Sequence, residues 1–105
     1  MNSVSTHVLD TGTGRPAPEV DVAIERLDGE EWLPHGRGST DVNGRITGFG
    51  VGFPPGRYRI RFDTGGYGSD FYPEVQITVD LTGADEHYHI PLLLSPYGYT
   101  TYRGS

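Results

Sequence analysis

The segment RYRIRF at residues 57–62 alternates strictly between arginine and a large apolar residue. Tyr58, Ile60 and Phe62 share one side of an extended chain, because successive side chains of a β-strand point to opposite faces. The three arginines then share the other side, in water. This segment predicts a β-strand with one face in a hydrophobic core and the other exposed.

Short alternating runs of the same kind recur along the chain, and turn residues separate them. Sixteen glycines and eight prolines lie between the runs, and no window sustains the apolar stripe of an amphipathic helix. The sequence therefore predicts an all-β sandwich that forms a single domain over residues 1–105. Two further strands are expected around Val20, Val22 and Ile24 and around Val75, Ile77 and Val79, with turns at Asp28-Gly29 and Asn43-Gly44.

The segment from Asp63 to Asp70 contains three glycines within four positions, 65, 66 and 68. Each glycine is about 1 kcal/mol less favourable than alanine inside a helix. We therefore expect a loop here and little or no helix in the protein.

Composition narrows the classes of function. The formal net charge is −6 and no basic run offsets it, which argues against a nucleic-acid partner, because Lys and Arg supply most of the affinity for phosphates. There is no cysteine, no apolar run long enough to span a membrane and no secretory leader pattern. We expect a cytoplasmic protein that does not bind membranes. Its low hydrophobic fraction, 34%, favours additional burial between subunits.

The last nineteen residues, 87–105, combine histidines, tyrosines, an arginine and a terminal serine in a pattern of two strands. His87 and His89 fall on the same strand face. Such a pair can bind zinc, with His7 as a possible third ligand, or it can consist of surface residues hydrogen-bonded at a sheet edge. His35, between Pro34 and Gly36, is interpreted as a solvated turn residue.

The tyrosines near the C-terminus do not share one face. Tyr97 and Tyr99 lie on one side of the expected last strand and Tyr102 on the other. A strand with aromatic residues on both sides is typical of a subunit interface or a pocket wall, and the alternative is an edge strand with exposed tyrosines.

Arg45 follows the Asn43-Gly44 turn. It is either an exposed strand residue or a planar, permanently charged group that holds an oxygen-rich ligand. The glycines at 12 and 14 do not form a phosphate-binding loop, because a strand pattern and not a helix follows them. The chain also lacks the Gly-x-Ser-x-Gly motif of serine hydrolases.

Three stretches together resemble the transthyretin-related 5-hydroxyisourate hydrolases. They are STHVLD with GRPA near the N-terminus, the NGR turn at 43–45, and HYHIPLLLSPYGYTTYRGS at the C-terminus. The YRGS ending is the most specific of them, because it separates the hydrolases from transthyretin itself, the hormone-carrier branch.

The resemblance implies a two-sheet, eight-stranded β-sandwich that assembles as a dimer of dimers, with substrate sites between the dimers. It implies hydrolytic ring opening of 5-hydroxyisourate in urate degradation, without a metal or an organic cofactor. By the same resemblance, catalysis falls to His7, Arg45, His89 and Ser105, and Tyr102 contacts the substrate together with His7 and Arg45.

Those residue types suit the hydrolysis of a cyclic amide. Histidine transfers protons near neutral pH, and an arginine can bind and polarise the oxygens of the substrate. Which histidine acts as base and which as acid is open. Two other hypotheses are a transthyretin-type carrier without catalysis and a structural β-sandwich module. The three polar groups His7, Arg45 and YRGS argue against an apolar carrier channel.

Overall fold

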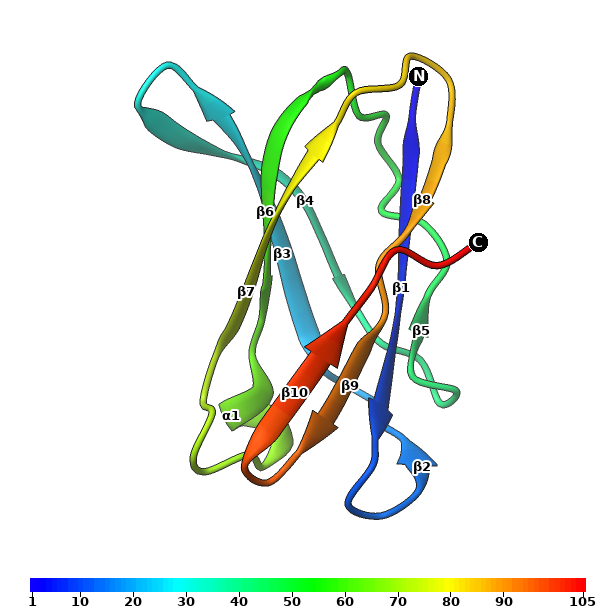
Figure 1. Cartoon of the computed structure of the whole chain (residues 1–105), viewed down its shortest axis with the longest axis vertical. Coiled ribbons are helices and arrows are strands. Elements are labelled where there is room, and N and C mark those ends of the chain that lie inside the picture. The colour runs from blue at the N-terminus through cyan, green and yellow to red at the C-terminus, as the bar shows by residue number, and fades with distance from the viewer.

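Two β-sheets pack face to face in the computed structural model, which describes all 105 residues (Figure 1). The four-stranded sheet is antiparallel and has the order β4-β3-β6-β7. Its strands are β3 (Asp21–Asp28), β4 (Glu31–Ser39), β6 (Gly56–Phe62) and β7 (Val75–Leu81).

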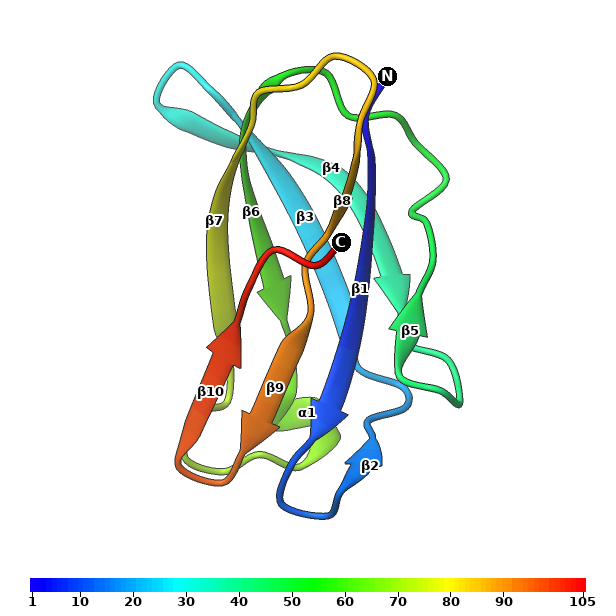
Figure 2. The same ribbon diagram turned by 45° about the vertical axis from the view of Figure 1, so that its right-hand side comes forward.

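The six-stranded sheet is built around the first strand, β1 (Ser3–Asp10). Its main path runs β10-β9-β1-β2, and β5 and β8 also pair with β1. The pairing with β8 and β9 is parallel, and the pairing with β2 and β5 is antiparallel (Figure 2). The other strands are β2 (Arg15–Pro16), β5 (Arg45–Ile46), β8 (His87–His89), β9 (Leu92–Ser95) and β10 (Gly98–Thr101).

The predicted eight-stranded sandwich is confirmed. Eight strands have three or more residues, and the two-residue strands β2 and β5 are additional. The turns at Asp28-Gly29 and Asn43-Gly44 lie where the sequence places them, and Gly29 and Gly44 both have positive φ.

The core lies between the sheets and follows the alternation of the sequence. Tyr58, Ile60 and Phe62 of β6 are at most 1% exposed. Val20, Val22 and Ile24 are equally buried on the neighbouring segment, and Val4, Val8 and Leu92 close the core from the six-stranded sheet. Ile77 and Val79 are only half-buried because β7 is an edge strand.

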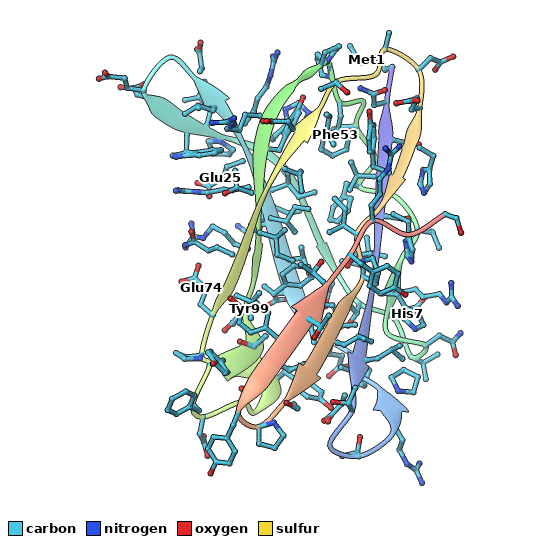
Figure 3. All side chains as sticks on the ribbon, in the orientation of Figure 1. Met1, His7, Glu25, Phe53, Glu74 and Tyr99 are labelled. Carbon is cyan, nitrogen blue, oxygen red and sulfur yellow. The ribbon has the colours of Figure 1, made fainter.

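The outer face of the four-stranded sheet carries the arginines of β6 in a network of ion pairs. Arg59 contacts Glu25 at 2.7 Å, and Arg61 bridges Glu25 at 3.3 Å and Glu74 at 2.8 Å. The hydrogen bond from Arg59 is the main reason why the pKa of Glu25 lies below its usual value. Figure 3 shows Glu25 and Glu74 on this outer side, away from His7. The charged half of the RYRIRF pattern is therefore paired across neighbouring strands.

The prediction of a loop over residues 63–70 is wrong, because a short helix, α1 (Thr64–Tyr67), lies there. The Asp63 side chain caps it by accepting a hydrogen bond from the Gly66 amide at 2.9 Å. The Thr64 side chain is fully buried, and the Tyr67 hydroxyl donates to Asp10 at 2.7 Å. These contacts outweigh the cost of the glycines. With four residues, α1 is too short to span a membrane, and no other helix is present.

His35 is not the solvated turn residue that the sequence indicated. It lies within β4 and is the extra residue of a β-bulge, since Ile24 pairs with Gly36 and Glu25 with Pro34. Its Nε2–H donates to the Gly52 carbonyl at 2.8 Å, and its ring centre lies 4.8 Å from that of Phe53. The bulge turns this side chain onto the aromatic part of the core.

Thr40 fixes the chain immediately before the turn that leads to Arg45. Its side chain is 3% exposed, donates to the Ala17 carbonyl at 2.7 Å and accepts from the Val20 amide at 2.9 Å. Thr40→Val keeps the shape but leaves both backbone groups without a partner. We expect the free energy of unfolding, measured by urea denaturation, to fall by about 2–4 kcal/mol.

Thr78→Val is the matched control, because Thr78 is exposed on β7 and its side chain makes no hydrogen bond. Its free energy of unfolding should change by less than about 0.5 kcal/mol. Equal losses in the two variants would contradict the role given to the Thr40 hydroxyl.

Candidate active site

Strand β1 brings three of the predicted site residues together through its pairings. His7 lies opposite Arg45 in the antiparallel pairing with β5, and Ser5 lies opposite His89 in the parallel pairing with β8. Val4 and Val8 of β1 face the core, so Ser5 and His7 face the outer side of the sheet. The candidate site therefore forms on the solvent side of β1.

The Asn43-Gly44 turn holds Arg45 in place. The Asp41 carboxylate accepts hydrogen bonds from the amides of Asn43 at 2.8 Å and Arg45 at 2.9 Å. Gly44 has a φ of 75°, and a Cβ at this position would lie 2.4 Å from the Val8 carbonyl oxygen. Only glycine fits this close approach to β1. The turn thus places Arg45 beside His7, and the Arg45 side chain is exposed.

His7 is held by the same turn. Its Nε2 lies 2.8 Å from the Asn43 carbonyl oxygen, which can only accept a hydrogen bond. The neutral ring therefore carries its proton on Nε2, and Nδ1 has the lone pair. This half-buried imidazole can accept a proton at Nδ1.

The C-terminal tail crosses back over β8 beyond β10 (Figure 2). The Gly104 amide donates to the His89 carbonyl at 2.8 Å, and the Arg103 guanidinium lies 4.6 Å from the centre of the Tyr88 ring. A Cβ on Gly104 would lie 2.5 Å from Cδ2 of His89. The glycine of YRGS therefore allows the tail to lie against the histidine, and Ser105 follows directly.

Arg45, His89 and Ser105 line one pocket of about 340 Å³. Ser5, Thr6, Thr47 and His87 complete its polar lining. His7 is the neighbour of this pocket through its pairing with Arg45. Three predicted catalytic residues that are far apart in the sequence are thus brought to one cavity, with the fourth beside it.

Tyr102 does not line this pocket. It is 56% exposed and lies with Arg103 along a second groove, formed with β7 and the apolar side chains of Tyr88 and Ile90. Its predicted contact with the substrate stays a prediction.

The environment of His89 favours its neutral form. Burial lowers the pKa of His89 from its usual value, and electrostatic repulsion from the neighbouring His7, His87 and Arg45 lowers this pKa further. A free histidine becomes charged when the pH falls below its usual pKa, whereas His89 keeps an uncharged imidazole to a more acidic pH. A neutral imidazole beside a guanidinium suits a general base that acts near neutral pH.

The pair His87 and His89 shares one face, as the sequence predicted, and serine hydroxyls surround it. Ser3 and Ser5 contact the two ring nitrogens of His87 at 2.6 and 2.8 Å, and Ser5 also contacts Nδ1 of His89 at 2.8 Å. Both nitrogens of His87 are therefore engaged, which matches the hydrogen-bonded alternative. No group of three or more His, Cys, Asp or Glu side chains is arranged to hold a metal ion.

Three residues of the site were not singled out from the sequence. Ser5 contacts both His87 and His89, and Asp41 accepts hydrogen bonds within the turn that precedes Arg45. Gly104 lets the C-terminal tail lie against His89. The alternation of β1 could have placed Ser5 on the face of His7, but its contact with the histidines depends on the parallel register with β8. Asp41, two residues before Asn43, matches the pattern in which an aspartate caps a turn.

The arrangement can bind a small oxygen-rich molecule and move protons on it. A guanidinium stabilises negative charge that develops on a carbonyl oxygen, and two imidazoles with available nitrogens can deprotonate water. The Ser105 hydroxyl makes no hydrogen bond with either histidine, so no nucleophilic serine pair is formed. These features fit direct attack by water.

Comparison with known proteins agrees with this chemistry. The family model described as the HIUase/Transthyretin family matches residues 4–104. A 5-hydroxyisourate hydrolase of Salmonella typhimurium is 43% identical over 99% of this chain and 82% of its own length. The solved Klebsiella pneumoniae 5-hydroxyisourate hydrolase superposes with a TM-score of 0.88 at 34% identity and full coverage of both chains.

A protein of the same fold that binds thyroxine is also similar. Sea bream transthyretin in complex with thyroxine superposes with a TM-score of 0.87 at 28% identity, over 96% of this chain and 93% of that one. The family match covers residues 4–104, nearly the whole chain and both sheets, so the chain belongs to the HIUase/transthyretin family.

Proposed function

We propose that the protein is a 5-hydroxyisourate hydrolase, which opens the ring of its substrate to 2-oxo-4-hydroxy-4-carboxy-5-ureidoimidazoline in urate degradation. The observation that carries this proposal is the pocket that joins Arg45, His89 and Ser105, with His7 beside it. The relatives from bacteria, yeast, worm and mouse bear this name and align along nearly the whole chain.

Each group has a place in the reaction. Arg45 binds the substrate oxygens and stabilises the negative charge that forms when water attacks the ring carbonyl. His89, held neutral, and His7, with its free Nδ1, take the proton from water and supply one to the leaving nitrogen. Ser105 donates a hydrogen bond to the ring, and Tyr102 is proposed to contact the substrate from the neighbouring groove.

The polar lining speaks against the alternative of a carrier for an apolar ligand. A ligand such as thyroxine, held by the sea bream relative, would have to cover Arg45 and two histidines that have no carboxylate partner. Burying the Arg45 guanidinium, which forms no ion pair, and the open Nε2 of His89 under an apolar ligand is unfavourable. Hydrolysis of a small, oxygen-rich ring uses them.

A homotetramer, built as a dimer of dimers, forms part of the proposal. Phe71, Tyr72, Tyr97 and Tyr99 form a continuous aromatic cluster, with ring centres 5.0 to 5.7 Å apart. Phe71 is 63% exposed and Tyr97 80% exposed, and β7 and β10 are both edge strands. Exposed aromatic residues at open edges are typical of subunit interfaces. The cytoplasmic location expected from the sequence stays a prediction.

Purified protein added to freshly generated 5-hydroxyisourate should accelerate its decay well beyond the spontaneous rate, followed by ultraviolet absorbance. Arg45→Glu and His89→Asn should each lower kcat/KM by about 10²-fold or more. The asparagine side chain in this variant can still form a hydrogen bond with Ser5, but it has no atom in place of Nε2. Arg15→Glu makes the same charge change at an exposed arginine of β2 and should keep full activity. A wild-type protein that leaves the decay unchanged would refute the proposed function.

The dependence of kcat/KM on pH should show an acidic limb below the usual histidine pKa of 6.5. Burial and repulsion from the neighbouring His7, His87 and Arg45 disfavour the imidazolium, so His89 stays an active base until the pH falls through its lowered pKa. The measurement subtracts the spontaneous decay at each pH. An acidic limb at or above 6.5 would contradict the assignment of His89 as the base.

Gly104→Ala should lower turnover by about 10²-fold, because a Cβ 2.5 Å from His89 displaces either the tail or the imidazole. Gly98→Ala is the matched control in β10, where a Cβ would meet its nearest atom, Oγ of Ser95, at an ordinary 3.5 Å. Circular dichroism and light scattering check that both variants keep the fold and assembly of the wild type. Full activity in Gly104→Ala would show that the contact between tail and histidine is not needed.

A further inference from the structure

Four polar side chains form an unbroken line along the paired strands β1 and β8. Oγ of Ser3 lies 2.6 Å from Nδ1 of His87, and Nε2 of His87 lies 2.8 Å from Oγ of Ser5. The same Ser5 oxygen lies 2.8 Å from Nδ1 of His89. Each of these contacts has hydrogen-bonding length, so the line connects Nδ1 of His89 with Ser3.

The parallel register of the two strands produces this line. Ser3 pairs with His87 and Ser5 with His89, whereas Val4 and Tyr88 between them face the core. The two serines and the two histidines therefore alternate on one surface of the sheet. Any shift of the register by one residue would break every contact of the line.

The line runs from the pocket to water. His89 is half-buried at the pocket and Ser5 is only 8% exposed, whereas His87 and Ser3 are exposed. Nδ1 of His89 is occupied by Ser5, and the chain offers no hydrogen-bond partner to its Nε2. His89 thus presents Nε2 for chemistry and is joined to the solvent through Nδ1.

The hydroxyl of Ser5 couples the protonation of the two histidines. It has one proton and touches a nitrogen of each ring, so it donates to one ring and accepts from the other. When it donates to His87, His89 carries its proton on Nδ1 and Nε2 has a lone pair. When it donates to His89, the proton of that ring sits on Nε2. The first state is a base toward the pocket and the second is an acid.

We propose that Ser5 and His87 form a proton relay that switches His89 between these two states during the proposed hydrolysis, on which this inference rests. As Nε2 of His89 takes a proton from the attacking water, the Nδ1 proton passes to Ser5. The Ser5 proton passes to Nε2 of His87, and the Nδ1 proton of His87 leaves to Ser3 or solvent. His89 is then neutral, with its proton on Nε2.

The relay runs backward in the second half of the reaction. Nε2 of His89 gives its proton to the leaving nitrogen as the carbon–nitrogen bond breaks, and Nδ1 receives the proton of Ser5. Ser5 is supplied by His87, and His87 by water, so the cycle closes with every proton returned. His89 never has to hold an imidazolium charge beside Arg45, where a second positive charge is unfavourable. Ser5 and His87 are positioning residues that act through His89.

His87→Ala and Ser5→Ala, each in the full-length protein, test the relay. In weakly buffered solution both should lower kcat by about ten- to a hundredfold, less than the roughly 10²–10⁴-fold expected when acid–base catalysis is lost altogether. Millimolar imidazole should restore most of kcat in His87→Ala, because the vacated position is exposed between Ser3 and Ser5. It should not restore Ser5→Ala, where the missing link is buried. A purely structural role would not produce rescue by imidazole.

His35→Gln serves as the control for unspecific effects of imidazole, since this histidine donates to Gly52 outside the pocket and should show no rescue. Rates are corrected for the decay of the substrate in imidazole without protein. If the wild type is active but His87→Ala keeps its kcat, or loses it without rescue, the relay is wrong while the hydrolase function stands. An inactive wild type would instead refute the proposed function.

Discussion

The pairing of β1 with its neighbours is the constraint on which both the core and the candidate site depend. One face of this strand closes the core with Val4 and Val8, and the other carries Ser5 and His7. Parallel pairing with β8 brings in the second histidine, and antiparallel pairing with β5 brings in the arginine. A slip of one residue would move polar side chains into the core and valines into the pocket. The hydrophobic energy that sets the register of the core therefore also sets the geometry of the site.

The distribution of charge separates the face used for stability from the face used for chemistry. The arginines of β6 are neutralised by Glu25, Glu74 and Asp80, outside the four-stranded sheet. Arg45 forms no ion pair, and no carboxylate side chain lines its pocket. A carboxylate beside His89 would stabilise the imidazolium and raise its pKa, and it would also compete with the substrate for Arg45. The chain is acidic overall, yet no Asp or Glu side chain lines this pocket, so Arg45 stays open to an electron-rich ligand.

Much of the fold could be predicted from the sequence, because the alternation around Ile60 and Ile24 directly reflects burial on one side of a strand. The helix α1 could not, since besides its local Asp63 cap it depends on the hydrogen bond from Tyr67 to Asp10, which is distant in the sequence. His35 shows the same limit, because a bulge in the pairing with β3 determines where its side chain points. The residues of the site could be predicted from a family resemblance. Their connection through Ser5 could not, since it depends on which residues face each other across two strands that are more than 80 positions apart.

The two glycines nearest the site indicate how such a pocket is assembled from distant segments. Gly44 brings the arginine turn against the backbone of β1, and Gly104 brings the tail against His89. In both places a Cβ would lie within 2.5 Å of another atom, so any side chain would push the segment outward. The two segments that carry Arg45 and Ser105 thus approach β1 and β8 more closely than side chains normally allow. The glycines of NGR and YRGS are therefore as much a part of the site as the arginine and serine that follow them, because they determine how far those groups lie from the histidines.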